Sequence, residues 1–339
     1  MDIEKLATTA QAIVAKGKGI LAADESFGTI EKRFKKIGVS STEENRRAYR
    51  ELLFTTKGIG EFISGVILFD ETLRQASADR TPFPKVLQKA GSIPGIKVDI
   101  GAKPLAGFPG EKITEGLDGL RERLAEYFKL GARFTKWRAV ITIGNGIPTR
   151  FCIDANAHAL AQYAALSQEA GLVPIVEPEV LMDGDHSIER CAEVTETTLK
   201  SLYFHLHAHR VVLEGTLLKP NMVIAGKSCP TQAKVGQVAQ ATVDVLRRCV
   251  PAAVPGIVFL SGGQSETEAT VHLNAMNRIS GLPWELSFSY GRALQASALD
   301  AWGGKASQLG AAQKAYYHRA KLNGAARHGK YTPAMESAG

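Results

Sequence analysis

Eight short apolar segments recur along the chain and alternate with stretches of helical periodicity. Each begins 30 to 46 residues after the one before it, an interval that holds a strand, a helix and two loops. The segments lie near residues 19–24, 65–70, 95–99, 134–143, 172–177, 211–218, 256–260 and 286–290. Strands that alternate with helices form parallel sheets, so the pattern predicts an α/β fold built from eight βα units.

Helix start and stop signals lie between these segments. Residues 1–17 have the apolar spacing of an amphipathic helix. Ser41-Thr42-Glu43-Glu44 is a capping box that opens a later helix. Two more helices are predicted near 115–130 and 154–170, each followed by a glycine, Gly131 and Gly171, that suits a helix end.

The chain contains no Pro/Ser/Gly-rich linker that would divide it into domains. We therefore predict a single (β/α)8 TIM barrel over residues 1–339, with an N-terminal helix at 1–17 and a basic C-terminal helix and tail at 305–339. A doubly wound open sheet is the alternative. It is disfavoured because no GxGxxG motif follows the first predicted strand.

Composition excludes several classes of protein. Of 339 residues, 45% are hydrophobic and 22% charged, which is typical of a globular chain, and no apolar run reaches membrane-spanning length. No targeting segment is recognisable at the N-terminus, so we expect a cytoplasmic protein without a membrane partner. Four scattered cysteines indicate neither a disulfide scaffold nor a zinc site.

The net charge of +7 comes mainly from the C-terminal segment. We interpret this segment as a solvated helix face and expect no nucleic-acid partner, because no aromatic-interleaved or zinc-finger pattern accompanies it. Its six bases are Lys305, Lys314, Arg319, Lys321, Arg327 and Lys330, with no acid among them.

Charged residues stand at the carboxyl ends of the predicted strands, where such barrels place their active sites. A charge inside an apolar run is costly unless it is paired or used, and one alone would indicate a structural ion pair. Several at the same end of different strands indicate a site. They are Asp24, Lys97, Lys136, Arg138, Glu177, Glu179 and Lys219.

Two groups of residues are candidates for binding phosphate. Ser261-Gly262-Gly263 follows the seventh strand and offers unobstructed backbone N–H groups, and Gly291-Arg292 opens the helix after the eighth. Loops seven and eight hold phosphate in many barrels. A second anion site is predicted from Ser26 and Thr29 after the first strand together with Lys97.

Lys219 has the setting of a nucleophilic lysine. An amine attacks a carbonyl only when it is unprotonated, and the apolar Leu217 and Leu218 and a nearby cation such as Lys136 favour that form. Glu177 and Glu179 could move protons during imine formation, and Asp24 could take the proton of a substrate hydroxyl.

The sequence also resembles class I fructose-1,6-bisphosphate aldolases over nearly its whole length. The matching blocks stand in the family's order: KGKGILAADES, TEENRR, GVILF, GIKVD, KWR, IVEPE, LEGTLLKPNM, FLSGGQS, SYGRALQASA and AWGGK. The resemblance implies a metal-independent enzyme without a cofactor that cleaves fructose 1,6-bisphosphate reversibly into dihydroxyacetone phosphate and glyceraldehyde 3-phosphate. It also implies a homotetramer, with Asp118 in the matching LDGL block.

The resemblance assigns roles to the residues already singled out. It implies Lys219 as the Schiff-base lysine, with Glu177, Glu179, Lys136 and Asp24 handling protons and charge. It implies that Ser261, Gly262, Gly263, Gly291 and Arg292 hold the ketose-end phosphate, that Ser26, Thr29 and Lys97 hold the other, and that Arg33 and Arg138 lie near the substrate. Many relatives end in a tyrosine that helps proton exchange. Here the last is Tyr331, and we do not transfer that role to it.

Three alternatives remain open at this level. The same chemistry serves fructose 1-phosphate or sedoheptulose 1,7-bisphosphate, and a barrel can act as a non-catalytic scaffold for other proteins. A metal-dependent aldolase needs histidines at the site, and none of the eight stands at a strand end. His205, His207 and His209 are interpreted as a solvent-facing helix end without a metal.

Overall fold

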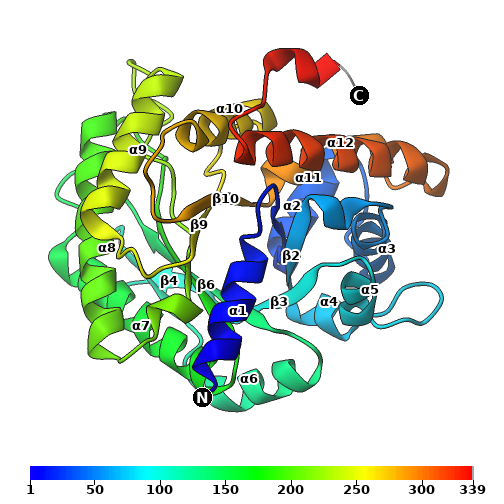
Figure 1. Cartoon of the computed structure of the whole chain (residues 1–339), viewed down its shortest axis with the longest axis horizontal. Coiled ribbons are helices and arrows are strands. Elements are labelled where there is room, and N and C mark those ends of the chain that lie inside the picture. Colours follow the sequence, from blue (N-terminus) through cyan, green and yellow to red (C-terminus); the bar gives the residue numbers. More distant parts are fainter. Residues whose placement is uncertain (338–339) are drawn as a thin grey trace.

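The computed structural model, which describes residues 1–337, contains a closed barrel of eight parallel strands, so the predicted (β/α)8 fold is confirmed (Figure 1). Around the barrel the strands follow the order β1-β10-β9-β8-β7-β6-β3-β2. Their bounds are β1 Gly19–Ala23, β2 Ile63–Leu68, β3 Ile93–Lys97, β6 Phe134–Ile141, β7 Val173–Val180, β8 Leu217–Leu218, β9 Gly256–Phe259 and β10 Glu285–Tyr290.

Helices surround the barrel, as Figure 1 shows, and α12 packs beside α10 and α11. The helices are α1 Ile3–Ile13, α2 Phe27–Lys36, α3 Glu43–Phe54, α4 Asp70–Arg74, α5 Phe83–Lys89, α6 Leu120–Lys129, α7 Arg150–Glu169, α8 Ile188–Ala208, α9 Val235–Cys249, α10 Glu266–Asn277, α11 Arg292–Trp302 and α12 Leu309–Arg327. Short 3-10 turns cover Ile59–Glu61, Leu213–Gly215, Ala306–Gln308 and Pro333–Ser337. Helix α3 begins close to the predicted start, but the predicted capping box is wrong: the N-cap is Thr42, whose side chain accepts a hydrogen bond from the Asn45 N–H, and the Asn45 side chain donates to the Ser40 carbonyl instead of completing a box.

The inward-facing residues change from apolar to charged along β6 and β7. On β6, Phe134 packs in the barrel interior, whereas Lys136 and Arg138, two and four residues later, reach the open end. On β7, Ile175 is followed in the same way by Glu177. Because side chains alternate between the two faces of a strand, this spacing gives an apolar interior below and a charged site above.

Helix α1 closes the amino end of the barrel. Its Leu6, Ala10 and Ile13 pack with the apolar inward residues of the strands, among them Val258. The close approach explains Gly215, where an added Cβ would lie 2.9 Å from the Cβ of Leu6. The floor of the site is therefore sealed from solvent.

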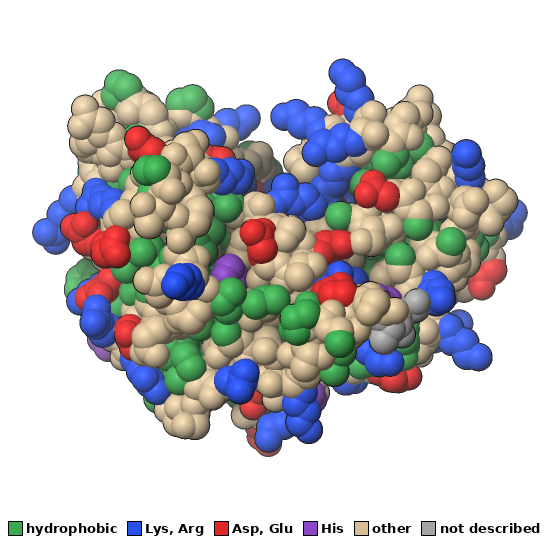
Figure 2. All heavy atoms as spheres, turned by 90° about the horizontal axis from the view of Figure 1, so that it is seen from above, with side chains coloured by type: hydrophobic (Ala, Val, Ile, Leu, Met, Phe, Trp, Pro, Cys, Tyr) green, Lys and Arg blue, Asp and Glu red, His purple; other side chains and the backbone are tan. Residues whose placement is uncertain are grey.

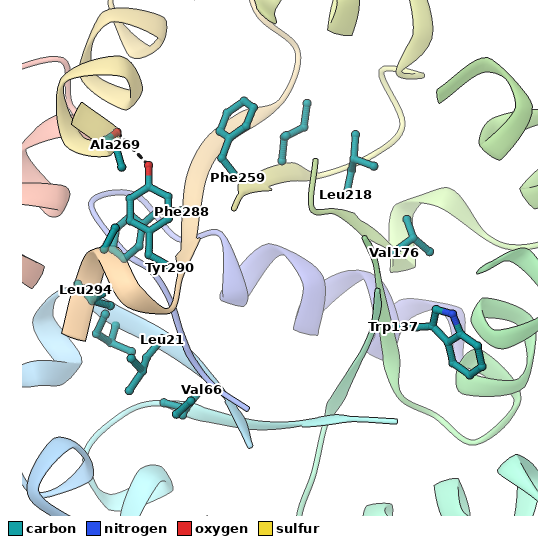
Figure 3. Close-up of a cluster of buried hydrophobic side chains, with 14 of the residues drawn as sticks. Leu21, Val66, Trp137, Val176, Leu218, Phe259, Ala269, Phe288, Tyr290 and Leu294 are labelled. Carbon is teal, nitrogen blue, oxygen red and sulfur yellow. Dashed lines mark hydrogen bonds between the residues drawn. The ribbon is translucent and has the colours of Figure 1, made fainter. Parts of the chain in front are cut away.

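The outward-facing residues of the strands form the larger core, against the helices. Figure 3 shows Leu21, Val66, Val176 and Leu218 in this layer. The Tyr290 hydroxyl donates a 3.0 Å hydrogen bond to the Ala269 carbonyl of α10 and so fixes that helix to β10 (Figure 3). Both faces of these barrel strands are thus covered, which holds the strand ends in place.

The sequence pattern was wrong about two elements. The strand predicted over 211–218 shrinks to Leu217–Leu218, because the Gln168 side chain bonds the backbone of Val212 and Gly215 and replaces the sheet hydrogen bonds there. The helix predicted near 115–130 begins only at Leu120. The residues before it form an antiparallel hairpin of β4 Gly101–Pro104 and β5 Lys112–Glu115 beside the barrel mouth.

The basic C-terminal segment is only partly a solvated face. Arg319 is buried and paired with Glu336, and Arg327 is buried with its guanidinium donating to the carbonyls of Val14, Lys18 and Leu286. The solvated-face interpretation is therefore wrong for these two residues, which join α12 to the rest of the fold. Within residues 1–337, no helix combines the length and apolar character needed to cross a membrane.

Candidate active site

One cleft of about 1640 Å³ opens at the carboxyl ends of the strands. It lies at the end of the barrel away from α1, where Figure 2 shows a hollow bordered by Lys and Arg side chains. All fifteen residues singled out from the sequence line this cleft: Asp24, Ser26, Thr29, Arg33, Lys97, Lys136, Arg138, Glu177, Glu179, Lys219, Ser261, Gly262, Gly263, Gly291 and Arg292.

Lys219 and Lys136 share one carboxylate at the centre of the cleft. The Lys219 Nζ lies 3.2 Å from Oε1 of Glu177, and the Lys136 Nζ lies 3.4 Å from Oε2 of the same residue. Only 4% of Lys219 and 3% of Glu177 is exposed, so this contact is almost free of water. The arrangement places a proton-carrying group directly beside a buried amine.

Asp24 forms the second contact of Lys136, at 2.6 Å. Burial alone would raise the pKa of Asp24, but the positive charges of Lys136 and Lys219 outweigh it and hold the pKa well below its ordinary value. Burial alone would likewise lower the pKa of Lys136, but Asp24, Glu177 and Asp99 raise it well above its ordinary value. Lys136 is therefore a fixed cation and Asp24 a fixed anion across the physiological range.

Asp99 completes this charge network, although sequence reasoning gave it no role. Its carboxylate lies 2.6 Å from the Lys97 Nζ and 4.0 Å from the Lys136 Nζ, and it accepts hydrogen bonds from the backbone N–H groups of Gly101 and Arg138. The sequence feature that could have identified Asp99 is its place at the end of the GIKVD block. Three ammonium groups thus face three carboxylates in one buried cluster.

Glu179 is paired with Arg138 rather than free. Burial alone would lower the pKa of Arg138, but the adjoining Glu179 carboxylate raises it well above its ordinary value. Half-exposed Arg138 lies at the rim, whereas Glu179 is buried. The pair presents a guanidinium toward the opening, where a phosphate or hydroxyl of a substrate would pass.

The predicted ketose-phosphate site is built from two turns. Gly262 and Gly263 both have positive φ, +42° and +77°, which favours glycine, and an added Cβ at Gly263 would meet the Met182 Sδ at 2.2 Å. Gly291 is the N-cap of α11, so the positive end of that helix faces the cleft beside Arg292. Glycine N–H groups, a helix terminus and a guanidinium are the donors by which proteins commonly bind anions.

The second predicted anion site begins at the start of α2. The Ser26 hydroxyl makes no capping bond to its helix and lies 3.2 Å from the Thr29 hydroxyl. Lys97 lines the same cleft but is bound to Asp99. This half of the site therefore consists of two hydroxyls, with a lysine that must share its charge.

Glu25 is a further residue that sequence reasoning missed. Its buried carboxylate binds both Arg33 and Arg50 and accepts a 3.0 Å hydrogen bond from the Gln295 side chain. Burial alone would raise the pKa of Glu25, but the two guanidinium groups outweigh it and lower the pKa. Glu25 therefore fixes where Arg33 enters the cleft. The sequence feature that could have identified Glu25 is its position between Asp24 and Ser26.

Comparison with known proteins agrees with this geometry. A family model described as "Fructose-bisphosphate aldolase class-I" matches residues 5–339. The chain belongs to the class I fructose-bisphosphate aldolase family. It is 62% identical to the "Probable fructose-bisphosphate aldolase class 1" of Xanthomonas campestris, over 98% of this chain and 99% of the relative.

Two further aldolases are similar to this chain in sequence or structure. The chain is 57% identical to "Fructose-bisphosphate aldolase 4, cytosolic" of Arabidopsis thaliana, over 96% of this chain and 84% of the relative. A crystal structure of the Plasmodium falciparum aldolase, in complex with TRAP and a small-molecule inhibitor, superimposes with a TM-score of 0.96 at 53% identity, covering 97% of this chain and 96% of that one. The family resemblance, the enzyme class and the barrel predicted from the sequence are confirmed: the chain is a lyase of the aldolase type.

Proposed function

We propose that this aldolase cleaves fructose 1,6-bisphosphate reversibly through an imine between the substrate C2 and Lys219. The observation that carries the proposal is the Lys219–Glu177–Lys136 contact, in which a buried amine and a second lysine share one carboxylate. Glu177 thereby holds the Lys219 nitrogen at the centre of the cleft, beside the charged Lys136.

The chemistry begins with addition of the Lys219 amine to the ketone of the open-chain sugar. Glu177 takes the proton that Lys219 gives up before it adds, and a second proton then moves from the added nitrogen to the former ketone oxygen. Glu177 returns its proton to the resulting hydroxyl, which leaves as water, and an iminium ion remains. Glu177 suits this step because its carboxylate lies 3.2 Å from the reacting nitrogen.

Cleavage follows when Asp24 takes the proton of the C4 hydroxyl. The C3–C4 bond breaks, its electron pair moves to the iminium nitrogen as an enamine, and the aldehyde glyceraldehyde 3-phosphate leaves. Protonation of the enamine at C3 and hydrolysis then release dihydroxyacetone phosphate and restore the free amine. Asp24 is ionised before this step and held in place by Lys136, so a carboxylate oxygen is available to accept the proton. Tyr331 is not among the residues that line the cleft. Its hydroxyl donates a hydrogen bond to Glu336.

Replacing Lys219 tests whether the barrel is an enzyme or only a scaffold. Lys219→Met should abolish turnover with the fold intact, whereas Lys200→Met, an exposed lysine on α8, should leave kcat and KM unchanged. A Lys219→Met protein that still cleaves the sugar would refute the mechanism. Retained activity in EDTA is also expected, since no step above uses a metal.

The two anion sites favour a bisphosphate over a monophosphate. We expect kcat/KM to rank fructose 1,6-bisphosphate above fructose 1-phosphate, and Lys97→Met to narrow the difference, because only the bisphosphate uses the site at Ser26, Thr29 and Lys97. Sedoheptulose 1,7-bisphosphate is the competing substrate to include. Equal kcat/KM for the bisphosphate and the monophosphate would contradict the second site.

A homotetramer in the cytoplasm completes the proposal. The printed name of the Arabidopsis relative includes "cytosolic", which supports the location. Asp118 is exposed in the turn before α6, where a neighbouring subunit could reach it. Sedimentation-velocity mass measurement tests the assembly, and a monomer at micromolar concentration would contradict it.

A further inference from the structure

Three histidines converge on the outside of the barrel, away from the cleft described above. His158 comes from α7, and His205 and His209 come from one face of the end of α8. One ring nitrogen from each lies within 4.8 Å of the others. The His158 ring centroid is 5.5 Å from that of His205 and 4.8 Å from that of His209, and the ring planes meet at 81° and 65°, so the rings are not stacked.

The hydrogen bonding of His209 fixes which of its nitrogens is free. Its Nδ1 lies 2.9 Å from the carbonyl oxygen of His205. A carbonyl oxygen only accepts hydrogen bonds, so Nδ1 carries the hydrogen and the lone pair of the neutral ring is on Nε2. Metal-binding histidines are commonly oriented by such a bond from their other nitrogen.

A carboxylate borders the histidine cluster. The Asp154 carboxylate lies one turn before His158 on α7 and is bound by the Ser201 hydroxyl of α8 at 2.7 Å. This adds negative charge beside the three rings without occupying them.

We propose that His158, His205 and His209 bind a Zn²⁺ ion, with water as the fourth ligand. Three imidazoles and one open position match the donor set that zinc takes in proteins. Zn–N bonds of about 2.0–2.1 Å in tetrahedral geometry require ring nitrogens roughly 3.4 Å apart. The ring nitrogens, which lie within 4.8 Å of one another, must therefore approach by up to about 1.4 Å. His158 is exposed and can make that movement.

Such an ion would join two neighbouring helices of the barrel wall. Helix α7 follows β6, which carries Lys136, and α8 follows β7, which carries Glu177. The zinc would stabilise the folded state, since the three ligands come together only in that state. None of the three histidines lines the active-site cleft, so the ion takes no part in the aldol chemistry.

The test uses tag-free full-length protein, freed of metal with EDTA and dialysed against zinc. Wild type should bind one equivalent with a rise in melting temperature. His158→Ala, His205→Ala and His209→Ala should each weaken binding by at least about tenfold. His207→Ala is the matched control, because His207 is exposed on the same helix and outside the cluster. It should bind as wild type does.

A cobalt spectrum shows whether the metal is bound by these histidines or by cysteine thiolates. Co²⁺ at the proposed site should give tetrahedral d–d bands without a thiolate charge-transfer band. The d–d bands should be lost in each variant that loses zinc binding and should persist in His207→Ala. His158→Asn removes a ligand by a mild change at an exposed position, so this variant should fold even if the others do not. Circular dichroism checks that each variant is folded. Zinc binding that survives both His158→Asn and His209→Ala, or a thiolate band in the cobalt protein, would overturn the proposal. Aldolase activity is not its readout.

Discussion

Replacing Lys136 by methionine perturbs both the stability and the chemistry of the cleft. The ammonium group lies 2.6 Å from Asp24, 3.4 Å from Glu177 and 4.0 Å from Asp99. At an effective dielectric constant of about 20, the two shorter pairs attract by roughly 6 and 5 kcal/mol. Desolvation of these ions cancels much of that, and removing one partner of a buried ion pair costs about 3–5 kcal/mol. We expect a loss of that size in the free energy of unfolding.

The pH dependence of this loss identifies its cause. In the wild type the pKa of Asp24 is held below its ordinary value, so the stability it contributes is present at neutral pH and is lost only as pH falls through that lowered pKa. In Lys136→Met, burial is opposed by fewer cations, and the carboxylates can relieve the strain by taking protons. The stability gap between variant and wild type should therefore be largest near neutral pH and narrow toward about pH 5.

Urea unfolding at several pH values measures the difference in unfolding free energy between Lys136→Met and wild type, and steady-state kinetics measures the change in kcat. Lys97→Met is the matched control, because its partner Asp99 keeps Lys136 and two backbone N–H donors. It should cost clearly less than Lys136→Met, because the carboxylate that it leaves behind keeps these partners. Lys136→Met should also lower kcat strongly. A variant as stable as wild type at neutral pH, or a gap that widens on acidification, would refute the electrostatic reasoning.

Three further substitutions test other parts of the structure. Glu25→Gln should lower the free energy of unfolding by about 3 kcal/mol and raise the KM, with a stability loss that shrinks as pH falls below the ordinary carboxyl pKa and is gone only below the lowered pKa of Glu25; an unchanged urea midpoint would contradict this. Gly263→Ala should weaken binding of dihydroxyacetone phosphate, measured by calorimetry, more than Gly281→Ala, which has a similar φ of +71° but open space around it; equal affinities would argue against the turn as an anion site. Arg327→Met should cost about 3 kcal/mol in urea unfolding, and Lys321→Met, exposed on the same helix, should cost almost nothing; similar losses would mean that the carbonyls bound by Arg327 do not need it.

The sequence predicted the barrel and its charged end because both follow from local patterns. The apolar segments were near-continuous, as expected for strands buried on both faces, and the strand-end charges were visible against them. Strands β6 and β7 begin and end close to the predicted positions. The fifteen site residues share one cleft because the carboxyl ends of parallel strands meet at one end of a barrel.

The errors arose where distant side chains decide the local structure. The segment before Lys219 is not a strand because Gln168, on another helix, takes its backbone hydrogen bonds. Arg327 is buried because carbonyls from the other end of the chain surround it. His158 joins His205 and His209 only through helix packing. No window of local sequence contains these contacts.

Borohydride reduction in the presence of dihydroxyacetone phosphate, followed by peptide mapping, examines the amine itself. The expected product is a single stable secondary amine on the peptide that contains Leu217, Leu218 and Lys219, with parallel loss of activity. A reduced adduct on Lys136 or any other side chain, or no adduct at all, would contradict the claim that Lys219 is the nucleophile.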